Sequence, residues 1–249
     1  MTFADHFSQQ SSLYASARPR YPDAVYAFVA QQAPARDHAW DCASGNGQAA
    51  EGLARHFQHV EATDASAEQI RHAPRIERVR FSVQTAEKTG FESGSFDAIC
   101  VAQALHWFDL ERFYTEARRV LKPGGVIAVW GYDWMRTAQG FDALFTQGVL
   151  GKLKPYWPAQ NRLLWGGYRT VAFPFERLEA PPFEMRLTWS FEQFMQYVLT
   201  WTGTRKYLES HGARALDADW EALRREWGDG LQREFVVPLH FLCGRHGQR

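Results

Sequence analysis

The feature that most constrains this fold is a short apolar segment that passes through a glycine-containing loop into a helical segment. Residues 39–42 are strand-like, a loop of small residues runs from Ala43 to Gly47, and a helical pattern begins at Gln48. This order is typical of the first half of a parallel βαβ unit, where bare backbone N–H groups and a helix N-terminus face a ligand. The next strand-like segment ends in Asp64, and an acid about twenty residues beyond such glycines usually binds a nucleoside ribose. We therefore expect a nucleoside-containing cofactor.

Strand-like and helical segments alternate through residue 130, and this alternation predicts a doubly wound, mostly parallel α/β sheet. Two later strand-like segments, 184–189 and 235–244, could add a C-terminal antiparallel hairpin at its edge. The predicted fold is a seven-stranded, Rossmann-like sheet. Its first five strands are expected at 39–42, 60–63, 79–83, 96–101 and 126–130, and its helices at 21–29, after Gly47, at 66–72 and at 110–121.

The length of 249 residues suits one α/β domain, so we expect a single domain over 1–249. Residues 132–182 break the alternating pattern and are predicted to form a helical insertion after the fifth strand. Aromatic residues make up 15% of the chain, and many of them follow residue 130. An insertion at this point would cover the acceptor site, although most of its aromatic residues are expected to build a satellite core.

Charge and composition exclude several classes of function. Lys+Arg and Asp+Glu both total 28, so no net field favours nucleic acid. No window approaches the ~20 apolar residues of a membrane span, and no signal-peptide pattern opens the chain. The cysteines, Cys42, Cys100 and Cys243, lie far apart, which favours buried thiols over a disulfide or a metal site. We expect a cytoplasmic protein without a metal; the oligomeric state is left open.

The type of cofactor depends on more than the glycines. Residues 45–50 match the dinucleotide fingerprint G-x-G-x-x-G/A, so a nicotinamide-dependent oxidoreductase is an alternative. Asp41, however, would repel the phosphates of a dinucleotide, and it suits a ligand that ends in an ammonium and a sulfonium. Thr85-Ala86-Glu87 follows the third strand and offers polar atoms to an adenine edge, and a polar and aromatic lip at 102–108 follows the fourth strand. Open α/β sheets bind their ligands at this edge.

Together these segments resemble the class I S-adenosylmethionine-dependent methyltransferases. The nearest branch is type 11, which includes trans-aconitate 3-methyltransferase-like proteins. The resemblance extends over essentially the whole chain. It rests on 41–48, Asp64-Ala65-Ser66, Ala86-Glu87, 103–108, 119–125 and 130–132, and on an N-terminal element formed by Tyr14, Arg18-Pro19 and Tyr21-Pro22.

The resemblance implies a role for each matched residue. The loop 43–47 would pass under the methionine part of the cofactor, and Asp64 would accept the ribose hydroxyls; a helix N-cap is the alternative role for Asp64. Ala43 stands where the motif often has its first glycine, and its methyl group is tolerable if φ is negative. An N-terminal lid over 1–30 would close the site. The implied cofactor-binding residues are Asp41, Ala43, Ser44, Gly45, Gly47, Gln48, Asp64, Ala65, Gln69, Thr85, Ala86, Glu87, Gln103, Ala104, Tyr14, Arg18 and Tyr21.

The expected reaction is in-line transfer of the methyl group to a small molecule, which leaves S-adenosylhomocysteine. His106 is the candidate general base, because an ordinary histidine titrates near neutral pH; a packed histidine is the alternative. A carboxylate acceptor needs no base, but it needs an arginine to hold it. A relative that binds the cofactor without turnover is also possible. Candidate acceptor-binding residues are Trp107, Trp134, Arg136, Trp165, Arg169 and Tyr207, with Arg18 as a further candidate carboxylate clamp.

Overall fold

The computed structural model describes residues 19–137 and 139–247, and it divides into two compact units. The first, here called the sheet unit, contains Tyr21–Asp133, Arg162–Glu184 and Pro238–Arg249. The second, the helical unit, contains Trp134–Asn161 and Met185–Val237. Each unit is described by itself.

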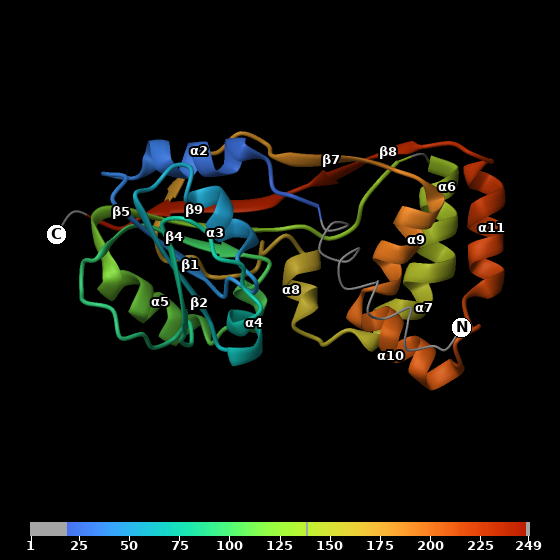
Figure 1. Ribbon diagram of the computed structural model, residues 1–249, viewed down its shortest axis with the longest axis horizontal. Coiled ribbons are helices and arrows are strands. Elements are labelled where there is room, and N and C mark those ends of the chain that lie inside the picture. Colours follow the sequence, from blue (N-terminus) through green and yellow to red (C-terminus); the bar gives the residue numbers. More distant parts are fainter. Residues whose placement is uncertain (1–18, 138, 248–249) are drawn as a thin grey trace. The chain divides into compact units, whose positions relative to one another are not determined.

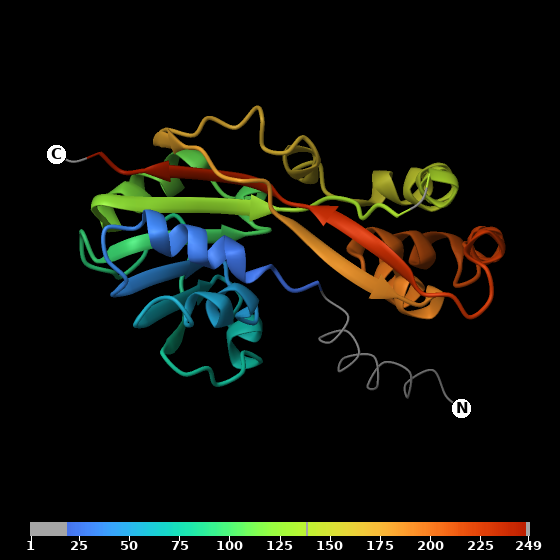
Figure 2. The same cartoon turned by 90° about the horizontal axis from the view of Figure 1, so that it is seen from above.

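The sheet unit is built on a seven-stranded sheet of order β3-β2-β1-β4-β5-β9-β6. Its first five strands run parallel, and β9 and β6 are antiparallel to their neighbours. Figures 1 and 2 show these strands lying side by side. The mostly parallel, seven-stranded Rossmann-like prediction is therefore confirmed. The strands are β1 (His38–Cys42), β2 (His59–Asp64), β3 (Val79–Val83), β4 (Phe96–Ala102), β5 (Leu121–Gly131), β6 (Glu176–Leu178) and β9 (His240–Arg245).

Helices cover both faces of this sheet, and α2 and α5 lie on opposite faces (Figure 1). The turn Leu105–Trp107 (η1) follows β4 directly. Side chains of β1 alternate between the two faces, as a strand requires: Trp40 belongs to the core beneath α5, and Asp41 points to the other side. The helices are α2 (Asp23–Gln32), α3 (Gln48–Leu53), α4 (Ala67–Arg71), α5 (Leu110–Val120) and α8 (Asn161–Trp165).

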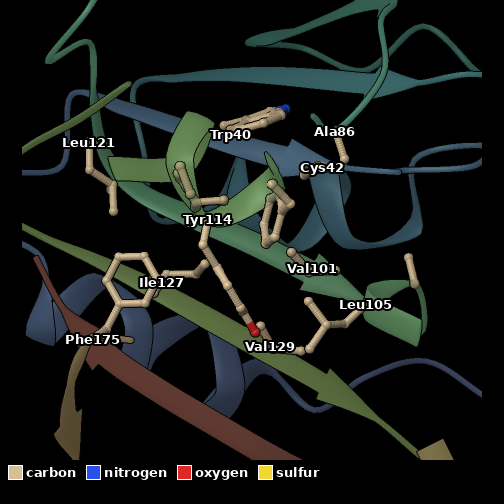
Figure 3. Close-up of a cluster of buried hydrophobic side chains, with 14 of the residues drawn as sticks. Trp40, Cys42, Ala86, Val101, Leu105, Tyr114, Leu121, Ile127, Val129 and Phe175 are labelled. Carbon is tan, nitrogen blue, oxygen red and sulfur yellow. The ribbon is translucent and has the colours of Figure 1, made fainter. Parts of the chain in front are cut away.

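Large apolar side chains from β1, β4, β5 and α5 form the core on the α5 face. Trp40 is fully buried and packs near Phe96 and Phe113, and the Tyr114 ring lies across Ile127 and Val129 (Figure 3). Burying each such side chain contributes roughly 1.5–3 kcal/mol. This core holds β1 and β4 rigidly side by side, and both strands end at the candidate site.

The helical unit is an aromatic core surrounded by short helices. Phe141, Phe194 and Trp227 are buried together, and Phe194 stacks on Phe235 with centroids 5.3 Å apart. The C-terminal antiparallel pair is present as β7 and β8, but it forms a separate two-stranded sheet and does not extend the edge of the seven-stranded sheet. The elements are α6 (Gln139–Leu144), the π-helical turn η2 (Phe145–Leu150), α7 (Gly151–Leu153), η3 (Lys154–Tyr156), β7 (Glu184–Trp189), α9 (Phe191–Leu199), α10 (Thr202–His211), α11 (Asp217–Trp227) and β8 (Arg233–Pro238).

Several elements differ from expectation. Strand β5 begins at Leu121 rather than Val126, because Leu121 already pairs with Phe96 before the register shifts. The segment predicted as an insertion is divided between the units, and its last part supplies β6. The three cysteines are free and buried, as expected. Within residues 19–137 and 139–247, no helix combines the length and the apolar composition that a membrane span needs.

Candidate active site

The loop after β1 turns through three residues with left-handed backbone. Gly45 has φ +56° and Gly47 has φ +93°, and Gly47 directly precedes α3. A Cβ on Gly47 would lie 2.6 Å from the ring of Phe81. Only glycine combines this φ with so close an approach. The glycines therefore let the loop lie flat against the neighbouring strands.

The third left-handed residue is Ala43, with φ +58°. The condition under which a methyl group was expected to be tolerable here, a negative φ, is therefore not met. A β-carbon in this region crowds the following carbonyl oxygen and costs roughly 1–2 kcal/mol. The tight exit from β1 imposes the left-handed conformation that a glycine would adopt freely.

The expectation of bare backbone N–H groups in this loop also needs correction. Ser44 donates its N–H to the carbonyl of Thr63 over 2.8 Å, and Gly47 donates to the carbonyl of Ser44 over 2.9 Å. Gly45 donates to Oδ2 of Asp64 over 2.9 Å. These bonds occupy three of the loop's N–H groups, and two of the bonds tie the loop to the end of β2.

Asp64 lies at the carboxyl end of β2 and is half-buried. Its Oδ1 accepts the N–H of Ser66 over 2.8 Å, while Oδ2 accepts the N–H of Gly45. Each carboxylate oxygen can accept a second hydrogen bond, so the side chain is oriented and still able to accept two hydroxyl protons. Ala65 is exposed beside it. Gln69, in α4, reaches toward the loop, with its Oε1 4.0 Å from the Cβ position of Gly45.

Asp41 is fully buried, and neither of its carboxylate oxygens accepts a well-formed hydrogen bond from the described residues. Burial raises the pKa of Asp41 from 3.8 to about 7; the backbone N–H of Ala50 lowers it in part, and the charge of Asp64 raises it further. A buried, unpaired carboxylate is costly unless a partner compensates it. A cationic ligand group at the loop would supply that partner.

The segment that follows β3 carries the residues predicted to meet an adenine. Ala86 is buried, and Glu87 accepts the N–H of Asp109, the N-cap of α5, over 3.1 Å. Thr85 and Lys88 form an antiparallel bridge that shapes the turn. The Glu87 side chain therefore fastens this segment to α5, which leaves recognition of an adenine edge to the backbone.

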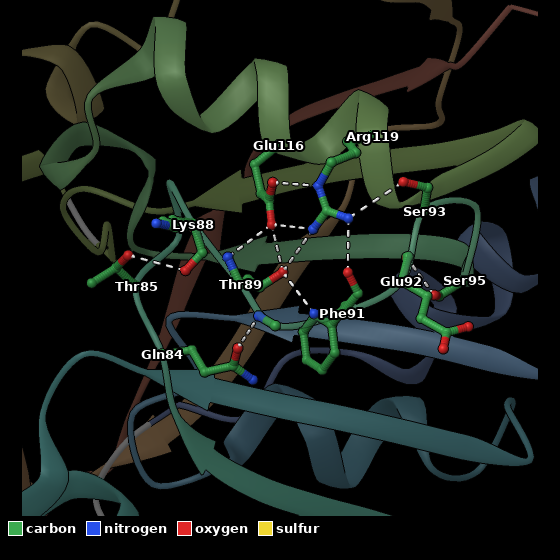
Figure 4. Close-up of polar contacts among 11 residues, drawn as sticks. Gln84, Thr85, Lys88, Thr89, Phe91, Glu92, Ser93, Ser95, Glu116 and Arg119 are labelled. Atoms are coloured by element: carbon green, nitrogen blue, oxygen red, sulfur yellow. Dashed lines mark hydrogen bonds and ion pairs between the residues drawn. The ribbon is translucent and has the colours of Figure 1, made fainter.

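A half-buried ion pair on α5, between Glu116 and Arg119, supports this segment (Figure 4). Oε1 of Glu116 accepts the N–H of Thr89 over 2.8 Å and an Nη2 hydrogen of Arg119 over 2.7 Å. Arg119 also donates to the carbonyl of Phe91 over 2.7 Å. Burial alone would raise the pKa of Glu116, but its hydrogen bonds from Arg119 and Thr89 outweigh burial and hold the pKa below its ordinary value.

Gln103, just beyond β4, is the second non-glycine residue of this edge with left-handed backbone, at φ +57°. Its amide accepts the N–H of Tyr132 over 2.8 Å and donates to the Tyr132 carbonyl over 3.2 Å. The side chain thus links the ends of β4 and β5. Ala104 beside it is buried.

His106 lies in η1 and is 4% exposed. Its Nδ1 is 3.1 Å from the hydroxyl of Tyr168, and the two rings are stacked. Burial lowers the pKa of His106 to about 4, so the imidazole is neutral at physiological pH. A neutral imidazole whose conjugate acid has so low a pKa is a weak base, and it removes a proton from an alcohol inefficiently. His106 stays a candidate catalytic residue.

The structure brings some acceptor candidates near this edge but not all of them. In the sheet unit, Trp107 is 51% exposed next to His106, Trp165 ends α8, and Arg169 is exposed beyond Tyr168. Tyr21 is buried against Trp130 and Tyr132. Tyr14 and Arg18 lie outside the described residues.

The remaining candidates belong to the helical unit. Trp134 packs against Trp157 and Trp201, with centroids 5.4 and 5.6 Å away. Arg136 pairs through its backbone with Val236, and Tyr207 packs on Tyr156 and His211. These contacts make all three part of the unit's own structure.

Sequence reasoning missed Tyr168 as a partner of His106, and the Glu116–Arg119 pair as the support of residues 85–91. No local signal marks Tyr168, because 62 residues separate it from His106. The i,i+3 spacing of Glu116 and Arg119 on a predicted helix could have indicated an ion pair, but not its burial.

The chain is similar to known methyltransferases, and the geometry of the loop after β1 agrees with this similarity. A family model described as a methyltransferase domain, of type 11, matches residues 40–129. A protein of Dictyostelium discoideum named as a methyltransferase is 29% identical over 98% of this chain and 95% of its own length. A solved structure from Anaeromyxobacter dehalogenans, named as a type II methyltransferase, is 40% identical over 93% of this chain and 99% of its own, with a TM-score of 0.87. The chain belongs to the S-adenosylmethionine-dependent methyltransferases.

More distant structures share the fold alone. The YcgJ protein of Bacillus subtilis is 19% identical over 90% of this chain, with a TM-score of 0.51. The glycine loop alone allowed either S-adenosylmethionine or a nicotinamide dinucleotide. Membership of this family favours S-adenosylmethionine. The residues of this chain fit the methyltransferase cofactor: a buried carboxylate lacks a partner at Asp41, and the flat loop 43–47 lies beside it.

Proposed function

We propose that this methyltransferase acts on a small molecule and that the acceptor is a carboxylate, which becomes a methyl ester. The observation that carries the assignment of the cofactor site is the buried Asp41 carboxylate at the tip of β1, beside the left-handed loop of Ala43, Gly45 and Gly47. The proposal agrees with the resemblance to the trans-aconitate 3-methyltransferase-like branch. We also propose a cytoplasmic location, because free buried thiols suit a reducing compartment.

Each residue of the cofactor site has a distinct task in this proposal. Asp41 compensates a cationic group of the cofactor, and Asp64, oriented by Gly45 and Ser66, accepts the ribose hydroxyls. The backbone of Ala86 faces the adenine, on a segment supported by Glu116. When bound, S-adenosylmethionine supplies a methyl group already activated by its sulfonium. The remaining work of the chain is to hold the acceptor in line and to exclude water.

The residues at the edge of the sheet support a carboxylate as the acceptor. A carboxylate is ionised at neutral pH, so no base is needed to generate the nucleophile. An alcohol or a phenol would need one, and His106 is buried, with a pKa of about 4. Arg169, exposed in the sheet unit, is available to hold a carboxylate.

The test uses matched acceptors and S-adenosylmethionine labelled in its methyl group. The full chain is incubated with trios that share a carbon skeleton, such as benzoate, benzyl alcohol and benzylamine, or butyrate, butanol and butylamine. The proposal predicts label in the acids alone, recovered as methanol after base hydrolysis. Label only in alcohols or amines would overturn the acceptor class. Binding of S-adenosylhomocysteine without transfer to any acceptor would instead indicate a relative that binds the cofactor without turnover.

A further inference from the structure

Two buried polar side chains, those of His106 and Tyr168, meet at the carboxyl edge of the sheet. The hydroxyl of Tyr168 lies 3.1 Å from Nδ1 of His106, and the rings stack with centroids 6.3 Å apart. Tyr168 is 0% exposed and His106 is 4% exposed. Water therefore does not compete for this hydrogen bond, and the two groups must satisfy each other.

The donor in the hydrogen bond between Tyr168 and His106 can be identified by asking where the hydroxyl proton and the imidazole proton must lie. A neutral imidazole has one nitrogen that donates and one that accepts, whereas a phenol can do both. Within the described chain, the Tyr168 hydroxyl has no hydrogen-bond partner other than His106. If this hydroxyl accepted a hydrogen from Nδ1, its own proton would be buried without an acceptor, which is costly. The hydroxyl therefore donates to Nδ1, and the imidazole proton resides on Nε2.

The backbone holds the hydroxyl in place. Tyr168 has a left-handed φ of +56°, fixed by a hydrogen bond from its N–H to the carbonyl of Leu163 and by another from the N–H of Val171 to its own carbonyl. A Cβ on Gly131 would lie 3.3 Å from the hydroxyl. A bulky residue persists in this conformation only where its surroundings enforce it, and such residues cluster at functional sites.

We propose that Tyr168 is a positioning residue that holds His106 as the neutral Nε2–H tautomer, so that His106 meets the acceptor as a hydrogen-bond donor and not as a general base. The part that concerns the acceptor rests on the proposed function; the tautomer does not. A donor at this position suits an acceptor oxygen that already carries negative charge, as a carboxylate does. Burial of His106, which lowers its pKa to about 4, keeps the ring neutral and agrees with this role.

The tautomer can be read directly by long-range ¹H–¹⁵N NMR of the full chain labelled at histidine. The signal of His106 is assigned by its loss in His106→Gln. The proposal predicts a neutral ring at pH 7.5 with the proton on Nε2 and none on Nδ1. A proton on Nδ1, or a charged ring, in the wild-type chain would overturn it, whatever the variants do.

Two matched variants separate this role from simple packing. Tyr168→Phe keeps the ring but removes the donor, so the Nδ1 resonance of His106 should shift and the second tautomer should become populated. Tyr114→Phe removes a buried hydroxyl of the same core that has no hydrogen-bond partner in the described chain, and it should leave the His106 signals in place. Equal spectra for the two variants would refute the proposal. Methyl transfer to the matched acids, alcohols and amines tests the proposed function separately, since the tautomer is observed without ligand.

Discussion

Gly45 donates its backbone N–H to Oδ2 of Asp64 over 2.9 Å, so the loop after β1 is fastened to the carboxyl end of β2. The bond brings together two segments that the sequence separates by 19 residues. It orients the Asp64 carboxylate and fixes the loop at the same time, and Ser66 holds the other oxygen. The cofactor site is therefore one hydrogen-bonded assembly rather than two independent motifs.

Replacing Asp64 tests this assembly. Asp64→Asn removes the charge and turns an amide donor toward one of two backbone N–H groups, so we expect a loss of about 1–3 kcal/mol in the free energy of unfolding. The affinity for S-adenosylhomocysteine should fall at least tenfold, because the amide can no longer accept both ribose protons. Urea titration and calorimetry measure the two effects. Glu61→Gln, on the same strand with an exposed partner in Arg80, is the control and should change stability by less than about 1 kcal/mol.

The raised pKa of Asp41 predicts that Asp41→Asn stabilises the protein, whereas Asp64→Asn destabilises it. In the folded protein this pKa is about 7, against an ordinary value of 3.8, so the folded state retains a proton that the unfolded chain releases between these values. Stability should fall as pH rises from about 4 to about 7. Asp41→Asn should abolish this fall and stabilise the ligand-free protein at pH 8 by up to about 4 kcal/mol. Urea unfolding at pH 5 and pH 8 measures the difference.

Asp229→Asn, at an exposed position, is the control for Asp41→Asn and should follow the wild-type pH dependence. If Asp41→Asn destabilises the protein equally at both pH values, the carboxyl is not held in its protonated form by burial, and our interpretation of Asp41 is wrong.

The strained backbone at Ala43 predicts that a glycine there is tolerated or stabilising. Relief of the left-handed strain would contribute about 1–2 kcal/mol, and the greater freedom of glycine in the unfolded chain offsets about 0.4–1 kcal/mol of this. Ala43→Gly should therefore raise the free energy of unfolding by about 0 to 1.6 kcal/mol. Ala67→Gly, at the start of α4, should lower it by up to about 1 kcal/mol. Equal losses in both variants would show that φ at Ala43 is not positive in solution.

The support beneath residues 85–91 predicts a response to acid. Because hydrogen bonds hold the pKa of Glu116 below its ordinary value, this carboxylate stabilises the fold above about pH 5 and loses that contribution as pH falls through its folded pKa. Glu116→Gln should cost about 1–3 kcal/mol at pH 7, and its difference from the wild type should shrink toward pH 3. Glu111→Gln, exposed in the same helix, should show little difference at any pH. Thermal unfolding from pH 7 to pH 3 distinguishes the two.

The sequence predicted those parts of the fold that local patterns encode. Strand β4 is nearly all apolar and was placed within one residue of its observed end, and β3 was placed at its observed bounds. Strand β6 has three residues that are mostly exposed, so no apolar pattern marks it. Helices α9 to α11 were not predicted, although Ser190 and Gln193 form a capping box at the start of α9.

The site was less predictable than the fold, because its geometry depends on distant contacts. An alanine at position 43 carries no signal of a positive φ; the strand ends that surround it impose one. Likewise, the partner of His106 lies 62 residues away, in a segment expected only to cover the acceptor. Motif spacing identified which residues meet at the edge of the sheet, but not how they are hydrogen-bonded.

Isothermal titration of S-adenosylhomocysteine and NADH into the wild-type chain and Asp41→Asn at pH 8 tests the central claim most directly. The claim is that the buried carboxylate of Asp41 is completed by the cationic end of a sulfur nucleoside. We predict that the wild type binds S-adenosylhomocysteine and not NADH, and that Asp41→Asn, although folded, binds S-adenosylhomocysteine at least tenfold more weakly. Equal affinity of the two proteins, or preference of the wild type for NADH, would contradict the account.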